Sequence, residues 1–188
     1  MSDLTQFDHY LAESGPAALV VFEYLVPVEG KDGVLFPATF ASGDGFAGGY
    51  NIDGDPAGEN VALIDSVGSQ ANRIEPIFAE PAYSKLVPQV KVTAGQKTIS
   101  LLEAGHRAGD AIMRASALQK ELQDAFLALL NGNATTLAKL APTSLVFGVW
   151  DSRDTQAKVP RAIASTIRAY NVRKLTRSAQ FVPAIDYV

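Results

Sequence analysis

Cysteine is absent from this sequence, histidine occurs twice, and no apolar run is long enough to cross a membrane. The missing thiols exclude cysteine nucleophiles, disulfide frameworks and zinc ribbons, and agree with a reducing compartment. A bilayer span needs about 20 apolar residues, and the opening MSDLTQFDHYLAES is acidic and polar, so no secretion signal is expected. We therefore expect a cytoplasmic protein with no membrane contact, no metal and no cofactor.

The net charge of -4 conceals an uneven distribution of charge along the chain. Residues 1–150 hold 9 Lys and Arg against 17 Asp and Glu, which gives -8, whereas residues 151–188 hold 7 against 3, which gives +4. A local positive field attracts phosphates even on an acidic protein. A polyanion contact confined to the last part of the chain is one interpretation, and a basic face exposed only to water is the alternative.

The most informative stretch runs from residue 144 to residue 171. Its apolar run, Leu145 to Trp150, predicts a strand, and a polar elbow follows from Asp151 to Lys158. Pro160 can then open a helix, because proline is tolerated in a first turn. The 3.6-residue period divides that helix into an apolar face of Ile163, Ile167 and Tyr170 and an opposite face of Arg161, Ser165 and Arg168. We expect the apolar face to pack on a sheet.

A second strand-then-helix pattern begins at Val61. Val61 to Ile64 predicts a short strand, and Asp65 or Ser66 can cap a helix after it. The apolar face of this helix would hold Val67, Ala71, Ile74 and Phe78, with Pro76 limiting its length. A helix rich in small polar residues with one arginine can grip a phosphate backbone. An ordinary capped amphipathic helix fits the pattern equally well.

Four further segments complete the expected organisation. Residues 17–28 are rich in β-branched and aromatic residues and predict a buried strand, and residues 29–60 predict a long loop. Asp110 to Asn131 predicts one long helix that Gly132 ends. Phe181 to Val188 predicts the start of another strand, and the chain stops there without a polar tail. We expect either a fragment or a protein whose last strand pairs outside this chain.

Two local patterns suggest other chemistries. Gly43 to Gly49 contains the spacing of a dinucleotide-binding loop, but no helix pattern follows to hold a pyrophosphate, so a nucleotide-binding module is only a weak alternative. The carboxylates of Asp53, Asp55 and Glu59 do not match the spacing of a calcium-binding loop. His106 could act as a general acid or base only with a partner in hydrogen-bond reach.

Three separated stretches resemble one protein family when they are taken together. LIDSVGSQANRIEPIF, SLLEAGHRAGDAIMR and FGVWDSRDTQAKVPRAIASTIRAYNV resemble signature regions of the backbone subunit of type I-U (also called I-G) CRISPR effector complexes, a member of the RAMP superfamily. The resemblance covers roughly residues 60–188, and residues 1–60 match loosely through an early strand and Phe36-Pro37. It implies a single α+β domain over residues 1–188, possessing a ferredoxin-like or RNA-recognition-motif-like palm, with residues 29–60 as an inserted loop or finger. Family members normally continue past Val188.

The resemblance implies a non-catalytic scaffold that binds guide RNA (crRNA). Its partners would be the guide, target DNA through the guide, other copies of itself and other effector subunits. RNA held for base pairing must be gripped by its sugar-phosphate backbone. Residue types suited to that grip occur at Ser66, Ser69, Gln70, Asn72, Arg73, His106, Arg107, Ser152, Arg153, Lys158, Arg161 and Arg168. The runner-up is a metal-independent ribonuclease that matures the guide, with His106 as its acid or base.

Overall fold

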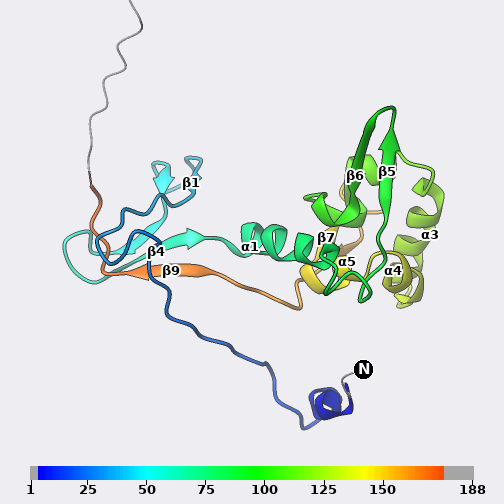
Figure 1. The fold of residues 1–188 in the computed structure, drawn as a ribbon, viewed down its shortest axis with the longest axis horizontal. Coiled ribbons are helices and arrows are strands. Elements are labelled where there is room, and N and C mark those ends of the chain that lie inside the picture. The colour runs from blue at the N-terminus through cyan, green and yellow to red at the C-terminus, as the bar shows by residue number, and fades with distance from the viewer. Residues whose placement is uncertain (1–3, 176–188) are drawn as a thin grey trace, which may run out of the picture. The chain divides into compact units, whose positions relative to one another are not determined.

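The computed structural model describes residues 4–175, which form a mixed α+β structure of small antiparallel sheets and several helices (Figure 1). This confirms the predicted α+β class, and it is compatible with a ferredoxin-like or RNA-recognition-motif-like fold. The chain divides into two units, residues 1–36 and residues 37–188. The expectation of one domain over the whole chain stays a prediction, and the strand predicted at residues 181–188 lies outside the described residues.

The first unit contains one short helix and a long irregular segment. The 3₁₀ helix η1 spans Leu4–Leu11. The predicted strand at residues 17–28 is wrong, because the segment has no regular structure and its apolar side chains are exposed, Tyr24 to 92%. A strand forms by pairing its backbone with a neighbour, and no strand among the described residues pairs with this one. Its β-branched composition alone is therefore not sufficient.

Short strands and turns occupy the segment between residues 37 and 59. Strand β1 (Thr39–Phe40) pairs with β2 (Gly49–Tyr50), and β3 (Ile52–Gly54) follows. A turn closed by Gly43 and Phe46 lies between β1 and β2. Because β2 and not a helix follows the glycines, the turn has no helix N-terminus with which to bind a pyrophosphate.

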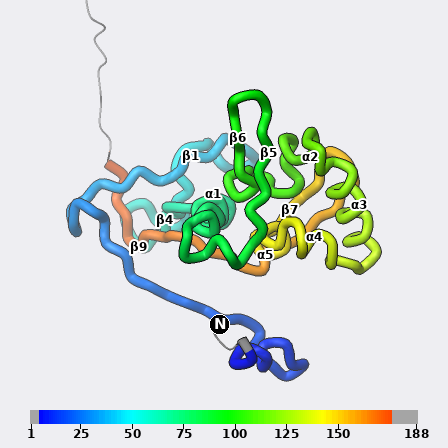
Figure 2. Tube along the Cα trace, turned by 45° about the vertical axis from the view of Figure 1, so that its right-hand side comes forward, coloured from blue at the N-terminus to red at the C-terminus, as the bar shows by residue number. Residues whose placement is uncertain are grey.

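A three-stranded antiparallel sheet joins the two stretches that the sequence singled out. Its order is β3-β4-β9, with β4 spanning Asn60–Asp65 and β9 spanning Ile167–Tyr170. Figures 1 and 2 both show β4 and β9 side by side although most of the chain separates them. The predicted strand at residues 61–64 is confirmed.

The predicted helix after Pro160 is wrong, and strand β9 takes its place. Side chains in β9 alternate between half-buried and exposed, which is the period of a strand. The backbone N–H groups of Ala162 and Ile163 both donate to the carbonyl of Val146, at 2.8 and 3.1 Å, and not to a helical neighbour. Ile163 is 50% exposed, so the predicted burial of its side chain is also wrong. β-branched residues favour the strand once β4 offers an edge to pair with.

Helix α1 (Val67–Ile74) follows β4 as the sequence predicted. Ser66 is its N-cap, and the Ser66 hydroxyl accepts from the Ser69 N–H at 3.3 Å. Ala71 is the buried residue of its apolar face. The chain tightens into the 3₁₀ helix η2 (Glu75–Ala79), with Pro76 in its first turn.

The main hydrophobic core lies in the helical part of the second unit. Phe126, Met113, Leu137, Leu122 and Val149 are among its buried residues. The elements in this part are β5 (Lys91–Ala94), β6 (Lys97–Ser100), η3 (Leu101–Glu103), η4 (Arg107–Gly109), α2 (Ala111–Arg114), α3 (Gln119–Leu130), α4 (Thr135–Leu140), α5 (Pro142–Phe147), β7 (Val149–Trp150) and β8 (Lys158–Val159). Strands β5 and β6 form one hairpin, and β7 pairs with β8.

The single long helix predicted from Asp110 to Asn131 is divided into α2 and α3. Asp110 caps α2 as expected, and Gly132 follows α3 with a φ of 83°. The break occurs at Ser116, whose hydroxyl donates to the Met113 carbonyl and accepts from the Leu118 N–H. Such local hydrogen bonds compete with those of a continuing helix.

The predicted strand from Leu145 to Trp150 is wrong except for its last two residues. Pro142 opens α5, Gly148 ends it with a φ of 80°, and only Val149 and Trp150 are in a strand. Short apolar runs fit a buried helix and a buried strand equally well. The proline at the first helical position decides in favour of the helix.

Candidate nucleic-acid interface

Asp65 organises the polar surface at the start of helix α1. Its carboxylate accepts from Gln70 Nε2 at 2.6 Å and forms an ion pair with Arg73 Nε at 3.0 Å. The Arg73 side chain is 73% exposed, so its guanidinium remains open to a ligand. Asp65 is the last residue of β4, and its carboxylate positions the side chains of Gln70 and Arg73 on helix α1.

The pKa of Asp65 lies below its usual value of 3.8. Burial of the carboxyl acts to raise this pKa. The hydrogen bonds from Ser69 and Gln70 and the charge of Arg73 together outweigh burial, so the net shift is downward. The ionised carboxylate therefore contributes stability that is present above 3.8 and is lost as the pH falls through the lowered folded-state value.

Replacing Arg73 by glutamine is expected to raise the pKa of Asp65, because one of the charges that favours the carboxylate disappears. NMR titration of the Asp65 carboxyl in the two proteins measures the shift. The control variant is Lys120→Gln, which removes the charge that Asp124 pairs with on helix α3. An unchanged Asp65 pKa in the Arg73 variant would contradict the ion pair.

The structure brings the polar face of α1 beside the segment that leads into β9. The Ser165 hydroxyl donates to Gln70 Oε1 at 3.2 Å across a sequence separation of 95 residues. Leu63 of β4 pairs with Arg168 of β9. A Cβ added to Gly68 would lie 3.5 Å from Arg161 Nη2, so this guanidinium is next to the first turn of α1.

These residues form what we call the α1–β9 surface. It comprises Ser66, Ser69, Gln70, Arg73, Arg161, Ser165 and Arg168. Its three arginines are exposed, its hydroxyl groups come from both segments, and its amide comes from Gln70 of α1. Two stretches predicted separately from the sequence are thus parts of one surface.

Arg107 lies in the interior beneath α1. Its Nε is 2.7 Å from Glu75 Oε2, and both side chains are at most 5% exposed. Its other guanidinium nitrogens donate to the Gly148 carbonyl and to Asn72 Oδ1, each at 3.2 Å. Asn72 is thereby held by Arg107, and the arginine itself faces away from solvent.

Burial changes the acid–base properties of this pair. It raises the pKa of Glu75, against the opposing effects of Thr143 and the Arg107 charge. Burial also lowers the pKa of Arg107, and the charge of the nearby Arg161 acts in the same direction. The charge of Glu75 acts against both by favouring the protonated guanidinium. Arg107 donates to the Gly148 carbonyl, and a Cβ added to Gly148 would lie 2.9 Å from Arg161 Cγ, so the buried pair lies close to the α1–β9 surface.

His106, beside Arg107, is exposed. Its position is fixed by its main chain, whose N–H donates to Asp110 Oδ2 at 3.3 Å and whose carbonyl accepts from the Gly109 N–H. A histidine that acts as a general acid or base is normally oriented through its ring nitrogens. The described hydrogen bonds of His106 do not orient its ring in this way.

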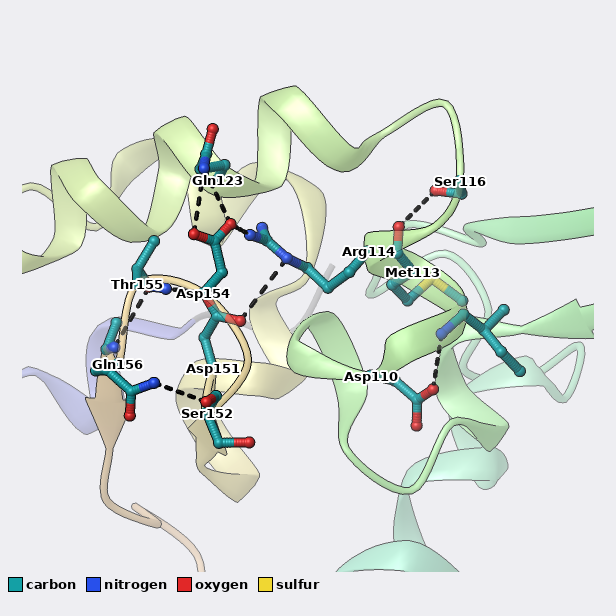
Figure 3. Close-up of polar contacts among 12 residues, drawn as sticks. Asp110, Met113, Arg114, Ser116, Gln123, Asp151, Ser152, Asp154, Thr155 and Gln156 are labelled. Atoms are coloured by element: carbon teal, nitrogen blue, oxygen red, sulfur yellow. Dashed lines mark hydrogen bonds and ion pairs between the residues drawn. The ribbon is translucent and has the colours of Figure 1, made fainter.

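The elbow after β7 is a tight turn organised by a buried carboxylate (Figure 3). Asp151 is fully buried and accepts from the Thr155 N–H at 3.0 Å and the Thr155 hydroxyl at 2.6 Å. Arg114 lies between Asp151 and Asp154 and forms an ion pair with each, and Gln123 of α3 donates to Asp154 at 3.0 Å. The turn is thus attached to α2 and α3.

The remaining predicted contacts project from this elbow. Ser152 and Arg153 are exposed on the turn, and Lys158 Nζ lies 5.5 Å from the centre of the Trp150 ring. Trp150 is 55% exposed. Ser152, Arg153 and Lys158 form a second group of predicted contacts, and none of the described hydrogen bonds and ion pairs joins them to the α1–β9 surface.

Sequence reasoning missed the residues that hold these groups in place. Glu75, Arg114 and Asp151 are buried charges whose partners come from distant segments. One local signal was available, because Asp is among the residues whose side chains favour turns by hydrogen bonding to nearby backbone groups. The long-range ion pairs have no comparable signature in a single sequence.

Comparison with known proteins identifies a family that the chain matches. A family model described as CRISPR-associated protein GSU0053 matches residues 19–174, which is most of the chain. No curated protein and no solved structure gives a significant match. Among the helices of residues 4–175, none has both the length and the apolar character needed to cross a membrane.

Proposed function

Because the chain belongs to the CRISPR-associated protein GSU0053 family, we propose that it is a non-catalytic, guide-RNA-binding backbone subunit of a type I-U effector complex, in the RAMP superfamily. It would hold the guide by its sugar-phosphate backbone, which leaves the base edges free to pair with target DNA. Other copies of the chain and other CRISPR subunits would be its neighbours along the guide.

The α1–β9 surface is the observation that carries this proposal. Arginine, serine and glutamine side chains are the groups that contact phosphate and sugar oxygens in protein–nucleic acid complexes. Arg73, Arg161 and Arg168 are exposed there on an otherwise acidic protein. Asp65 and the Ser165–Gln70 hydrogen bond fix the segments that bear them, so the surface needs little ordering when RNA binds.

The elbow supplies a second group of contacts. Arg153 and Lys158 are exposed, and the attachment of the turn to Arg114 keeps their backbone positions fixed. An exposed tryptophan beside a lysine suits single-stranded nucleic acid, whose bases stack on aromatic rings. Arg107 has a supporting role in this proposal, because its guanidinium holds Asn72 from inside.

Replacing Arg73, Arg161 and Arg168 together by glutamine is expected to weaken binding of guide-length single-stranded RNA roughly 100-fold at low salt. If each arginine neutralises one phosphate, the slope of log affinity against log salt should fall by about 2. Fluorescence anisotropy across a salt series measures both quantities. The matched control replaces Lys91, Lys97 and Lys139, which are exposed outside the α1–β9 surface.

Equal losses in the two triple variants would indicate a general charge effect and would contradict a defined RNA path. The same reactions test the ribonuclease alternative, since the RNA is expected to be recovered at its original length. Cleavage that disappears in a His106→Ala variant would replace the scaffold proposal with an enzyme.

A further inference from the structure

One face of the β3-β4-β9 sheet carries Arg168 of the α1–β9 surface together with side chains that this surface does not include. Asp53 of β3 is opposite Val61 of β4, and Val61 is opposite Tyr170 of β9. Directly opposed residues of antiparallel strands project on the same face. Arg168 belongs to this face two residues before Tyr170. Glu59 lies in the bend just before β4 and lines the hollow on this face.

A hollow of about 510 Å³ opens on this face. It is lined by one aromatic residue, one aliphatic residue, two acidic residues, two asparagines and a glycine: Tyr170, Val61, Asp53, Glu59, Asn60, Asn171 and Gly54. We call it the Tyr170 recess. Tyr170 is 59% exposed, so most of its ring is free to make a contact.

The backbone around the Tyr170 recess is held in place before any ligand arrives. The buried Asn60 side chain accepts from the Val172 N–H at 2.8 Å and donates to the Val172 carbonyl at 3.1 Å. The main-chain carbonyl of Asn60 accepts from the Asn171 N–H. These bonds fix the end of β9 although Asn171 has a φ of 54°. Gly54 has a φ of 101°, and a Cβ there would be 2.5 Å from the Glu59 carbonyl, so only glycine fits.

We propose that the Tyr170 recess receives one unpaired nucleobase of the bound RNA, stacked on Tyr170, with Asp53 and Glu59 accepting from its exocyclic amino group. Exposed aromatic side chains on a sheet stack unpaired bases. Carboxylates accept from base amino groups and repel phosphate, whereas Arg168 on the same face attracts it. The recess thus has a place for the base and a separate place for its phosphate. This inference rests on the proposed function.

The charge of the recess predicts a preference among bases. Adenine and cytosine carry an amino group that a carboxylate can accept from, whereas uracil offers carbonyl oxygens that Asp53 and Glu59 would repel. Oligoadenylate should therefore bind more tightly than oligouridylate of the same length. An Asp53→Asn, Glu59→Gln double variant, in which neutral amides replace both carboxylates, should show a smaller preference.

The experiment measures binding of oligoadenylate, oligouridylate and an oligoadenylate with abasic positions to the full chain. Tyr170→Ala is expected to weaken oligoadenylate binding about tenfold with an unchanged salt slope, whereas Tyr170→Phe, which retains the ring, should bind within about twofold of the unmodified protein. The abasic oligomer should bind to the unmodified protein and to Tyr170→Ala equally.

The outcomes separate this inference from the function on which it rests. If Tyr170→Ala binds as the unmodified protein does while the triple arginine variant loses RNA, the recess takes no base and the scaffold proposal stands. If Tyr170→Ala changes self-association and not RNA affinity, the recess is a contact between copies, and the inference is overturned. If the unmodified protein binds none of the three oligomers, both proposals fail.

Discussion

Replacing Arg107 by methionine is expected to lower the free energy of unfolding by about 3–5 kcal/mol. The substitution leaves the Glu75 carboxylate, which is 1% exposed, without its cation in the interior. It also removes the donors to the Gly148 carbonyl and to Asn72. Urea denaturation followed by circular dichroism measures the change.

Two further variants identify the cause of that loss. A Glu75→Gln, Arg107→Met double variant should recover part of the stability, because a neutral amide costs less to bury than an unpaired carboxylate. Lys120→Met breaks the exposed pair with Asp124 on helix α3 and should change stability little, as surface pairs usually do. An Arg107→Met variant as stable as the Lys120→Met control would show that the buried pair is not what holds η2 to η4.

The effect should also depend on pH. Burial raises the pKa of Glu75 above its usual 4.5, and Arg107 acts to lower it, so removal of Arg107 raises it further. A raised carboxyl pKa gives stability that is present below 4.5 and is lost as the pH rises through the folded-state value. The deficit of the Arg107→Met variant should therefore be smaller in acid than at neutral pH.

Local signals predicted the part of the fold that local chemistry determines. Ser66 caps α1, Asp110 caps α2 and Gly132 follows α3, and in each case the side chain or the missing Cβ acts on its own neighbours. The β4–α1 unit followed from its sequence because an apolar run, a cap and an amphipathic helix occur there in order.

The errors occurred where a distant segment decides the structure. The residues around Ile167 fit a helical period, yet they also fit the alternation of a strand, and pairing with β4 selects the strand. Tyr170 was for this reason assigned to a buried helix face, whereas it is exposed in the recess. Residues 17–28 illustrate the converse case, since strand-forming composition without a paired neighbour among the described residues gives no strand.

The same distinction between local signals and distant contacts applies to the candidate site. Charge density along the sequence identified the region of Arg153, Arg161 and Arg168, because charge is a property of composition. It did not reveal that Arg107 is buried, since that depends on Glu75 and Gly148 reaching it from other segments. The predicted contacts of the exposed surface residues with RNA stay predictions until binding is measured.

Replacing Asp151 by alanine is expected to lower the free energy of unfolding by about 2–4 kcal/mol. The substitution removes the oxygen that accepts from both the N–H and the hydroxyl of Thr155, and it removes one partner of Arg114, in a position with no solvent to replace them. The expected loss of stability is smaller than for Arg107→Met, because Arg114 keeps its ion pair with Asp154, whose side chain is 33% exposed. Denaturation of the variant and hydrogen exchange at the amides of residues 151–157 measure the two effects.

Asp154→Ala is the matched control on the same turn. Water can reach its site, so Arg114 would be partly solvated and the loss of stability should be lower than for Asp151→Ala. If the elbow positions Arg153 and Lys158 for RNA, Asp151→Ala should also weaken RNA binding under conditions where the protein remains folded. Hydrogen exchange at the amides of the turn should then be faster in this variant. A larger loss of stability from Asp154→Ala than from Asp151→Ala would mean that the outer carboxylate, and not the buried one, holds the elbow against α2.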